Sequence, residues 1–497
     1  MRGVFDGLVG FIHLEEVEAQ LLEHPIVTRL ANIKQLSLAG GVFPGASHSR
    51  LSHALGTMHY AGRIATACRK APRSRVGKDF VQKARVAALL HDIGHPALSH
   101  AVELMFRRRF NTALAGKAMR GRPMGDVGLG HRVTRAIQAF APEGNPFDND
   151  LVSAYLIRES SLAGVLEKAG LDPEEVSAMV ANTHPLQVYN QILHGGLDAD
   201  KLDYLQRDGH ATGVGFGVFD VEQILRHLGV HKDVLYIEED AANACLHFVF
   251  SRYFWYSQVI HNKNVSVLER MAQVSYQSLA ENELLPTATE FLDLLGRIAT
   301  GDKKAENEWC GFTDAAFFSA IRTMRKTISS GKRVAEGTLP RTVLRDFLER
   351  ILTQRPLKCV VRLDAVKVGH MGANNELQWL HQHPRHQAFE RFEDWLGVEM
   401  GPELASKRII MTNEEIPLIK PIDDERPIQV KTPYDSEPTP LQQHYYSMIL
   451  PMAAGQEVLP RFVIKRIYCV DELIPVLEKR WKAFASKVRE RRTPSAT

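Results

Sequence analysis

Four separated segments of the sequence carry residues that could do chemistry. His53 lies in HSRLSHALG, His91 and Asp92 lie in LLHDIGHPALSH, His131 follows a glycine-rich stretch, and Asp200 lies in GGLDADKLDYLQRD. Imidazole and carboxylate groups together suit Mn, Fe, Zn, Ni or Co, and side chains from different helices can converge on one such ion. The residue types therefore predict a site for a divalent transition metal.

The HDIGH segment allows two local arrangements. His91 and His95 are four residues apart, so they share one helix face if the helix continues through both. A helix end before Pro96 would instead let His95 and His100 fold over the same ion. Taken alone, a His-Asp dipeptide is weak evidence, because polar residues also gather at helix C-termini. The distinguishing feature is the order: a helical histidine, then HDxGH, then a distant aspartate in DxDKLDY.

Most elements that must position these residues are predicted to be helices. Segment 49–70 starts with Ser49, a plausible N-cap, and continues amphipathically. Segment 81–94 has apolar residues at helical spacing before a Gly and a Pro, and segment 246–277 contains neither Pro nor Gly. Residues 111–130 are rich in glycine and basic residues, which predicts a mobile loop.

The C-terminal part of the sequence has a different character. Residues 355–368 are β-branched and alternating, which predicts a strand, and residues 461–473 read as a strand followed by a helix. A basic helical tail, EKRWKAFASKVRERRTPSAT, ends the sequence. We therefore expect a mostly α protein with a helical core over 1–354, which includes the loop at 111–130, and a smaller α+β lobe over 355–497.

Composition excludes several classes of protein. The 497 residues exceed the roughly 250–300 at which single cores stop growing, and 44% apolar residues with a net charge of +3 argue against disorder and against general polyanion binding. No apolar run reaches the roughly 18–20 residues of a membrane helix, and the first residues contain acids where a signal peptide is apolar. The five cysteines are scattered without a CxxC pair. We expect a cytoplasmic protein with no membrane partner.

Several motifs resemble those of one enzyme family. NIKQL (32–36), VFPGASHSRLSHALG (42–56), HDIGHPALSH (91–100) and DADKLDYLQRD (198–208) are similar, in the same order, to motifs of the HD-domain deoxynucleoside triphosphate triphosphohydrolases. The resemblance covers about residues 1–275 and is loose beyond them. It implies an HD-domain helical phosphohydrolase core as the larger part of the fold.

The resemblance also implies a ligand set and a reaction. The ligands of one divalent metal per chain would be His53, His91, Asp92 and Asp200. Family members cleave a dNTP into deoxynucleoside and triphosphate, through attack of a metal-activated water on the α-phosphorus. Magnesium could accompany the substrate as a second ion.

Protonation of the leaving 5′ oxygen requires an acid. His131 matches the histidine that acts as acid in the family, and Glu103 matches its carboxylate partner, which is Asp in other members. His95 and His100 match residues near the α-phosphate. The alternative for His131 is an ordinary surface histidine after a loop.

A triphosphate carries about four negative charges, so basic side chains must face it. The resemblance implies three phosphate contacts, one aromatic residue beside the sugar, two contacts to the 3′-hydroxyl and one bulky residue that disfavours a 2′-hydroxyl. In that order they are Arg50, Lys201 and Arg252, then Tyr204, then Gln35 and Asp208, and finally Leu36. A second family tyrosine beside the sugar is replaced by Ile260, so selection against ribonucleotides does not follow from the resemblance.

Two other functions stay open. With the same metal site, the loop at 111–130 and the basic tail could make the protein an HD-type nuclease or phosphodiesterase acting on oligonucleotides or single-stranded nucleic acid. The protein could also be a nucleotide-sensing module with an idle metal centre. The family assembles as dimers to hexamers, so the resemblance implies a homo-oligomer with a dNTP as its substrate.

Overall fold

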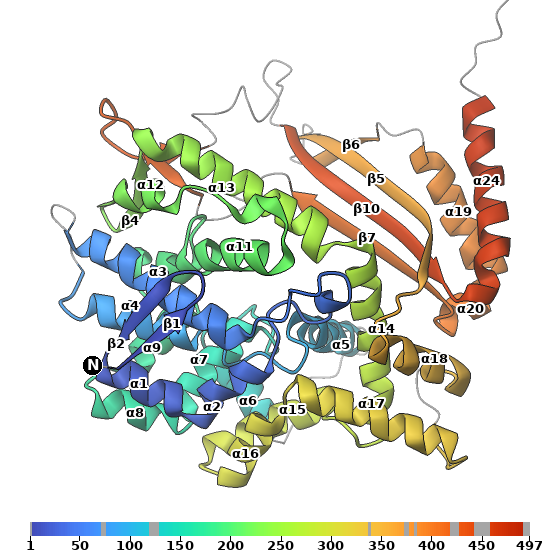
Figure 1. Cartoon of the computed structure of the whole chain (residues 1–497), viewed down its shortest axis with the longest axis horizontal. Helices are drawn as coiled ribbons and strands as arrows, with labels where there is room; N and C mark the ends of the chain where they lie inside the picture. The colour runs from blue at the N-terminus through green and yellow to red at the C-terminus, as the bar shows by residue number, and fades with distance from the viewer. Residues whose placement is uncertain are drawn as a thin grey trace, which may run out of the picture. The chain divides into compact units, whose positions relative to one another are not determined.

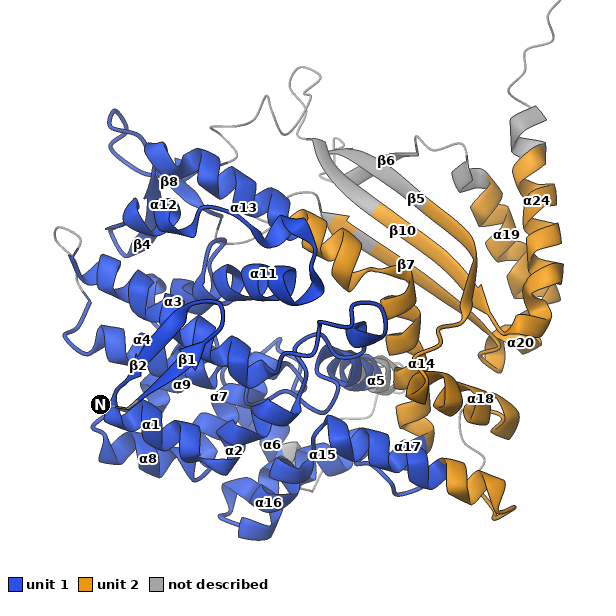
Figure 2. Cartoon of the chain, in the orientation of Figure 1, with its two compact units in different colours: residues 1–252, 279–324, 423–441 blue, residues 253–278, 325–422, 442–497 orange. Residues whose placement is uncertain are grey.

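The computed structural model describes residues 2–70, 76–118, 129–335, 339–371, 377–381, 385–417, 427–441 and 458–490. Figure 2 shows the two compact units into which the chain divides. The first unit comprises residues 1–252, 279–324 and 423–441, and the second comprises residues 253–278, 325–422 and 442–497. Each unit is thus built from three stretches of sequence, whereas the sequence suggested one boundary after residue 354.

Helices dominate the described residues and the strands form small sheets, so the prediction of a mostly α fold is confirmed (Figure 1). Helix α3 (Arg50–Lys70) packs against α4 (Phe80–Leu90) and α11 (Ala199–Thr212). Small buried residues on α3, such as Ala54 and Ala61, leave room for neighbouring helices to come close. These three helices carry most of the residues that the sequence singled out.

The HDIGH segment is a turn rather than a continued helix. Helix α4 ends at Leu90, and α5 (His100–Ala118) begins only after the turn. A Cβ on Gly94 would lie 2.6 Å from both the Asn149 carbonyl oxygen and the Ser153 nitrogen of α7 (Asn149–Glu159). Because no side chain fits there, the glycine allows the turn to pack directly against α7.

Buried polar groups hold this turn in place. The Arg29 guanidinium donates to the His95 carbonyl oxygen at 2.6 Å, and the Asp314 carboxylate accepts from the Leu98 N–H at 2.8 Å. Leu98 and Ser99 have positive φ angles of 59° and 51°, which typically cost about 1–3 kcal/mol for residues other than glycine. The surrounding contacts must therefore impose the backbone path between the HD pair and α5.

The N-terminal hairpin pairs β1 (Arg2–Asp6) with β2 (Gly10–Leu14) in an antiparallel register. The other helices that lie wholly or mainly in the first unit are α1 (Glu16–Glu23), α2 (Pro25–Thr28), α6 (Leu129–Gln138), α8 (Leu162–Lys168), α9 (Pro173–Val180), α10 (Gln187–His194), α12 (Val221–Arg226), α13 (Ala242–Trp255), α15 (Ala288–Ala299), α16 (Lys303–Gly311) and α17 (Asp314–Ser329).

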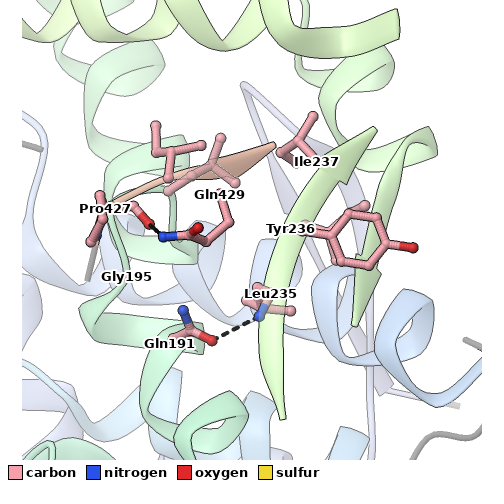
Figure 3. A pocket seen from close by; sticks show the side chains of 11 residues that line it. Gln191, Gly195, Leu235, Tyr236, Ile237, Pro427 and Gln429 are labelled. Atoms are coloured by element: carbon pink, nitrogen blue, oxygen red, sulfur yellow. Dashed lines mark hydrogen bonds between the residues drawn. The ribbon is translucent and has the colours of Figure 1, made fainter. Parts of the chain in front are cut away.

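A second small sheet in this unit has the strand order β3-β4-β8-β9. Its strands are β3 (Leu228–His231), β4 (Val234–Glu238), β8 (Gln429–Lys431) and β9 (Thr439–Pro440), and β8 is parallel to β4. Figure 3 shows the adjoining pocket, of about 20 Å³, where the Gln191 side-chain oxygen accepts from the Leu235 N–H at 2.8 Å. Among the described residues, no acidic, basic or histidine side chain lines this pocket, and we do not treat it as a candidate site.

The second unit is built on an antiparallel sheet of order β6-β5-β10-β7. The strands are β5 (Lys358–Met371), β6 (Leu377–His381), β7 (Ile409–Pro417) and β10 (Val458–Cys469), and the helices are α14 (Lys263–Glu281), α18 (Arg341–Leu352), α19 (Arg385–Glu399), α20 (Gly401–Ala405) and α24 (Ile474–Glu490). Buried Phe392, Ile467 and Leu477 belong to its core, which joins α19 and α24 to the sheet. The strand expected at 355–368 and the strand followed by a helix expected from residue 461 are confirmed, because β10 ends at Cys469 and α24 begins at Ile474.

Two sequence predictions of local structure differ from the fold. The predicted loop over 111–130 is helical to Ala118, because residues 111–118 continue α5, and residues 119–128 lie outside the described part. The single helix predicted over 246–277 is interrupted by a π-helical turn at Tyr256–Ile260. Helix α14 then starts anew, since the Asn262 side chain accepts from the Asn264 N–H at 3.0 Å. No described helix is long and apolar enough to cross a bilayer.

The close approach of α3 and α11 at Gly56 can be tested by stability. A Cβ at Gly56 would lie 1.8 Å from the nearest Asp203 carboxylate oxygen, so Gly56→Ala should lower the free energy of unfolding by about 1–3 kcal/mol. Gly164 in α8 has no neighbour within 4 Å of such an atom, and Gly164→Ala should raise stability by up to about 1 kcal/mol. Chemical denaturation of both variants measures the difference; equal stabilities would contradict the packing described.

Candidate metal centre

His53 is the most enclosed member of the candidate centre. It lies in α3 with 1% of its surface exposed. Its Nε2 atom lies 2.9 Å from the Asp200 carboxylate, and its Nδ1 atom lies 2.8 Å from the Asp203 carboxylate. The ring is therefore held from behind by Asp203, with Nε2 directed to the centre.

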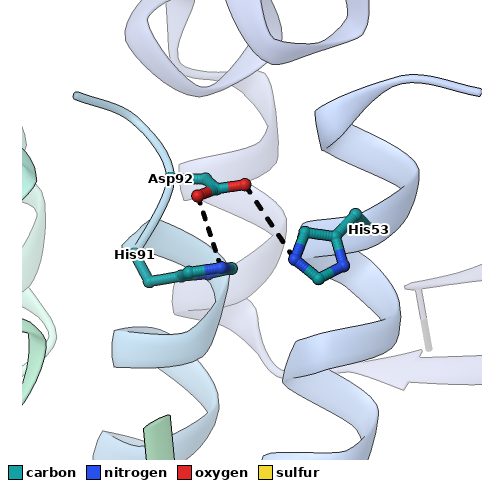
Figure 4. Close-up of side chains that lie close together, drawn as sticks. All are labelled: His53, His91 and Asp92. Carbon is teal, nitrogen blue, oxygen red and sulfur yellow. Dashed lines mark ion pairs between the residues drawn. The ribbon is translucent and has the colours of Figure 1, made fainter. Parts of the chain in front are cut away.

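His91 and Asp92 reach the same point from the end of α4. The His91 Nδ1 atom pairs with the Ala88 carbonyl oxygen at 2.7 Å, which leaves Nε2 to face Asp92 at 3.5 Å and Asp200 at 3.7 Å. Figure 4 shows the Asp92 carboxylate between the two imidazoles, at 4.0 Å from His53 Nε2. Ligand atoms of His53, His91 and Asp92 all lie within 4.8 Å of one another.

This donor set fits a divalent transition metal. Two imidazole nitrogens and two carboxylates converge, and the second ring nitrogen of each histidine is engaged by a carboxylate or a backbone carbonyl oxygen, as is usual for metal-binding histidines. About 30% of the Asp200 side chain is exposed, whereas the other three are buried. The centre is thus accessible to a ligand from the Asp200 side.

Charges in the centre are strongly coupled. Burial lowers the pKa of His53, but hydrogen bonds to Asp200 and Asp203 outweigh it and raise that pKa to about 10. Burial raises the pKa of Asp92, but Arg50, His91 and His95 outweigh it and hold that pKa well below the ordinary value. The carboxyl is therefore ionised, and a cation that binds His53 must displace a proton.

Behind His53, buried charges form a chain that ends in the N-terminal hairpin. Arg207 donates to both oxygens of Asp203, each at 2.8 Å, and to both oxygens of Asp6, at 2.9 and 3.2 Å. Asp203 and Arg207 stand on successive turns of α11, and Gly56 of α3 leaves the space that their side chains fill. The orientation of the metal-facing imidazole thus depends on a buried ion network.

A second cluster lies beside the HD pair. His95 Nε2 lies 3.3 Å from the Asp92 carboxylate, and the opposite side of the His95 ring faces Glu103. His100 Nδ1 pairs with Glu103 Oε2 at 2.9 Å. Burial raises the pKa of Glu103, but the neighbouring His100, His95 and Arg107 outweigh this and lower it to about 2. His131 lies in α6, and its side chain is outside the described residues.

Two of the three residues predicted to contact phosphate, Arg50 and Lys201, stand beside the centre. The Arg50 guanidinium pairs with the Asp92 carboxylate at 2.6 Å and donates to the Ser99 hydroxyl at 2.6 Å. Lys201, next to Asp200 in the first turn of α11, pairs with Asp198 at 2.5 Å. Two basic groups therefore stand beside the ligand set, although each already has a carboxylate partner.

The residues predicted to contact the sugar are less closely linked to the centre. Gln35 donates its backbone N–H to the His48 carbonyl oxygen at 3.1 Å, and the His48 ring pairs with the Asp208 carboxylate at 2.7 Å. Leu36 and Tyr204 are buried in the first unit. Arg252, the third residue predicted to contact phosphate, is buried in α13. Ile260, which stands where the family has a second tyrosine, is the last residue of the π-helical turn and belongs to the second unit.

The sequence interpretation missed two side chains that hold the centre. Asp203, which fixes His53, stood in the recognised DxDKLDY motif, and its spacing of three from Asp200 on one helix was the signal for it. Asn149, which donates to the Asp92 carboxylate at 3.3 Å, gave no signal because its contact spans 57 residues. Both act through the metal-facing residues rather than on a ligand directly.

One known protein family matches the part of the chain that holds most of the candidate centre. The HD domain family matches residues 50–122, a span that includes His53, His91 and Asp92. This part of the chain is therefore similar to an HD domain, and the resemblance predicted from the motifs is confirmed. Asp200 lies beyond the matched span, but the fold brings it to the same centre.

Curated relatives share parts of the chain. The deoxynucleoside triphosphate triphosphohydrolase SAMHD1 of Danio rerio is 26% identical over 372 residues, which is 72% of this chain and 55% of that protein. SAMHD1 of Homo sapiens is 27% identical over 238 residues, 43% of this chain and 34% of that protein. The uncharacterized protein YwfO of Bacillus subtilis is 30% identical over 232 residues, 46% of this chain and 45% of that protein. The chain thus spans about half the length of such relatives, or less.

Solved structures share the fold over almost the whole chain. A phosphohydrolase of Bacteroides thetaiotaomicron has a TM-score of 0.61 at 18% identity, covering 94% of this chain and 99% of that one. A hypothetical protein of Aquifex aeolicus has a TM-score of 0.61 at 21% identity, covering 96% and 99%. At such identities the likeness concerns the fold alone.

Removal of the HD pair should remove the metal. In the double variant His91→Ala/Asp92→Ala two of four donors are lost, so we expect tightly bound Mn²⁺ or Co²⁺ to fall from about one equivalent at this centre to none while the helical content remains. Elemental analysis after desalting measures the metal, and circular dichroism measures the helices. His59→Ala, in the same α3 as His53, is the control. Undiminished metal at this centre in the double variant would contradict the assignment.

Asp203 should tune the metal affinity without touching the metal. Asp203→Asn removes the charge behind His53, so the affinity should fall about 10- to 100-fold, as for other groups behind metal ligands. Competition with a chromophoric chelator measures this affinity. Glu222→Gln is the matched control, because it removes a carboxylate from the exposed pair with Arg63. An unchanged affinity in Asp203→Asn would show that the orientation of His53 does not depend on this carboxylate.

Proposed function

We propose that this protein is a metal-dependent dNTP triphosphohydrolase, which converts a dNTP and water into a deoxynucleoside and triphosphate. The observation that carries the proposal is the convergence of His53, His91 and Asp92, in the segment that matches an HD domain, with Asp200 of α11 at the side open to solvent. Similarity to proteins named deoxynucleoside triphosphate triphosphohydrolase supports the substrate class.

A divalent metal, when bound at this centre, supplies a Lewis acid for a phosphoryl oxygen and lowers the pKa of a bound water. The chain itself holds the ligands in place. Asp203 and the Ala88 carbonyl oxygen fix the two imidazoles, while Arg50 and Asn149 fix the Asp92 carboxylate. Because these supports are buried, the centre is organised before a substrate arrives.

Two basic side chains favour a polyphosphate over a neutral ester. Lys201 adjoins Asp200 at the open side, and only 14% of its side chain is exposed. We infer that Lys201 and Arg50 share their charge between their present carboxylate partners and the phosphates of the substrate. Arg252 is the third phosphate contact that we propose.

Proton transfer to the leaving 5′ oxygen needs a group near the reacting atoms. We propose that His131 donates this proton and that the ionised Glu103 stabilises its charged form. His95 and His100, which flank Glu103, would contact the α-phosphate. For the sugar, we propose contacts to Tyr204, Gln35 and Asp208, with Leu36 against the 2′ position.

Identification of the products tests the proposal. Manganese-loaded protein incubated with each of the four dNTPs should release free deoxynucleoside and triphosphate in equal amounts, and no pyrophosphate or phosphate. The variant His91→Ala/Asp92→Ala, which lacks half of the donor set, is the matched control and should lose at least about 10³-fold in rate. Liquid chromatography with mass spectrometry identifies both products.

Two results would contradict the proposal and favour the alternatives. Intact dNTPs together with shortened oligonucleotides would indicate a nuclease or phosphodiesterase. A metal-loaded protein that binds nucleotides but turns over none would indicate a sensing module. Formation of a homo-oligomer stays a prediction of the resemblance, and size measurement of the same sample tests it.

A further inference from the structure

We propose that the outer edge of strand β2 is a docking site for an extended, acidic peptide segment of a partner protein. A groove of about 840 Å³ adjoins this edge. Five consecutive residues, Phe11 to Glu15, line the groove, and the first four of them lie in β2. None of the lining residues belongs to the metal centre, so binding here is independent of what the centre hydrolyses.

Among the described residues, β2 pairs with another strand on one side only. The hairpin is a two-stranded sheet of order β1-β2, so the side of β2 that faces away from β1 is an edge. On that side the Arg85 guanidinium donates to the His13 carbonyl oxygen at 2.8 Å. In an antiparallel pair, the N–H and C=O groups of one residue point the same way, and this direction alternates along the strand. The backbone groups of Phe11 and His13 therefore point into the groove.

Helix α3 forms a second wall of the groove. Four of its residues line the groove at the spacing i, i+3, i+4 and i+7, which places them on one side of a helix: His59, Gly62, Arg63 and Thr66. A Cβ on Gly62 would lie 3.0 Å from the Cγ and Cδ atoms of Arg85, so the glycine leaves room for the arginine that reaches the strand. An extended peptide can add a strand to such an edge, and main-chain hydrogen bonds then supply affinity.

Arg63 is the cation that this wall offers to a partner. Burial, together with the guanidinium groups of Arg63 and Arg85, lowers the pKa of His59, as expected for a ring in positive surroundings. Arg85 is held by the buried Glu18, whereas Arg63 pairs with Glu222, whose side chain is 56% exposed. An exposed pair contributes little, so Arg63 can exchange Glu222 for a carboxylate of the peptide. A small anion gains only this exchange, whereas a peptide also gains the backbone edge.

Apolar side chains flank the edge as well. Val81 of α4 and Leu225 of α12 line the groove. The Phe11 ring is 52% exposed and contacts the His13 ring edge to face, with centroids 4.8 Å apart. Side chains of an added strand alternate between two faces, and five residues of edge span roughly 17 Å. The occupant we expect is therefore a segment of about five residues in which acidic and apolar residues alternate.

Selection from a peptide library tests the proposal. A phage-displayed library of random heptapeptides is selected on the full-length protein, with counter-selection on the variant His13→Pro. Proline removes the N–H that points into the groove, but it spares the bonds to β1, which come from the neighbouring residues. We expect to recover peptides in which acidic residues alternate with β-branched ones.

Synthetic copies of the recovered peptides measure the binding by fluorescence anisotropy. His13→Pro and Arg63→Glu should each weaken binding at least about tenfold, because one hydrogen bond or one ion pair is lost. Arg297→Glu is the matched control and should bind as the wild type does, since the pair of Arg297 with Glu308 is equally exposed but lies outside the groove. Methylation of alternate peptide nitrogens should abolish binding in one register and spare it in the other.

Hydrogen exchange places the peptide on the protein. Bound peptide should slow the exchange of the backbone amides of Phe11 and His13. Circular dichroism and retained Co²⁺ should show that the variants His13→Pro and Arg63→Glu keep the fold. Recovery of no peptide that prefers the wild type over His13→Pro would overturn the proposal. Binding that survives both Arg63→Glu and methylation in either register, or protection confined to other elements, would overturn it as well.

Discussion

The buried carboxylate of Asp203 is the contact on which the centre depends. It sits between the His53 imidazole and the Arg207 guanidinium, and a charge so enclosed is tolerated only when it is paired on every side. Pairing has a structural consequence, because it fixes the plane of the imidazole and turns Nε2 toward Asp200. Arg207 in turn binds Asp6 of the N-terminal hairpin, so the hairpin, α3 and α11 are held together by the network that orients the metal-facing ring.

His91 and Asp92 are positioned by the turn between α4 and α5 rather than by an ion network. Here the chain leaves α4, turns against α7 at Gly94 and passes through two left-handed residues before α5. Arg29 and Asp314 bind backbone groups of this path, which offsets the cost of its conformation. Because this segment is a turn and not a continued helix, His91 and Asp92 face His53 while His95, only a few residues later, faces Glu103. The density of titratable groups in this part of the chain follows from that geometry.

Much of the fold could be predicted from the sequence, because periodicity and turn residues are local signals. The helix at 49–70, the strand at 355–368 and the strand and helix after residue 461 are examples. Motif order also indicated that His53, His91, Asp92 and Asp200 converge. The residues that hold the centre in place could not be predicted, since Asn149 contacts Asp92 across 57 residues of sequence and Arg29 contacts His95 across 66. Arg50, predicted to face phosphate, lies on Asp92, a pairing that no local pattern encodes.

The same locality explains the errors in the helices. Glycine and basic residues at 111–130 suggested a loop, yet residues 111–118, which include alanines and a leucine that favour helix, continue α5. An unbroken run without Pro or Gly at 246–277 suggested one helix, but the side chain of Asn262 starts a new one.

The central claim is that a metal binds to Asp92 and to the Nε2 atoms of His53 and His91, because Asp203 and the Ala88 carbonyl oxygen engage the Nδ1 atoms of the two rings. Anomalous diffraction from a Co²⁺-soaked crystal tests this claim most directly. The account predicts a peak within about 2.0–2.3 Å of Nε2 of both His53 and His91 and of the Asp92 and Asp200 carboxylates. No peak there at saturating metal, or a peak bound through His53 Nδ1 and Asp203, would contradict it.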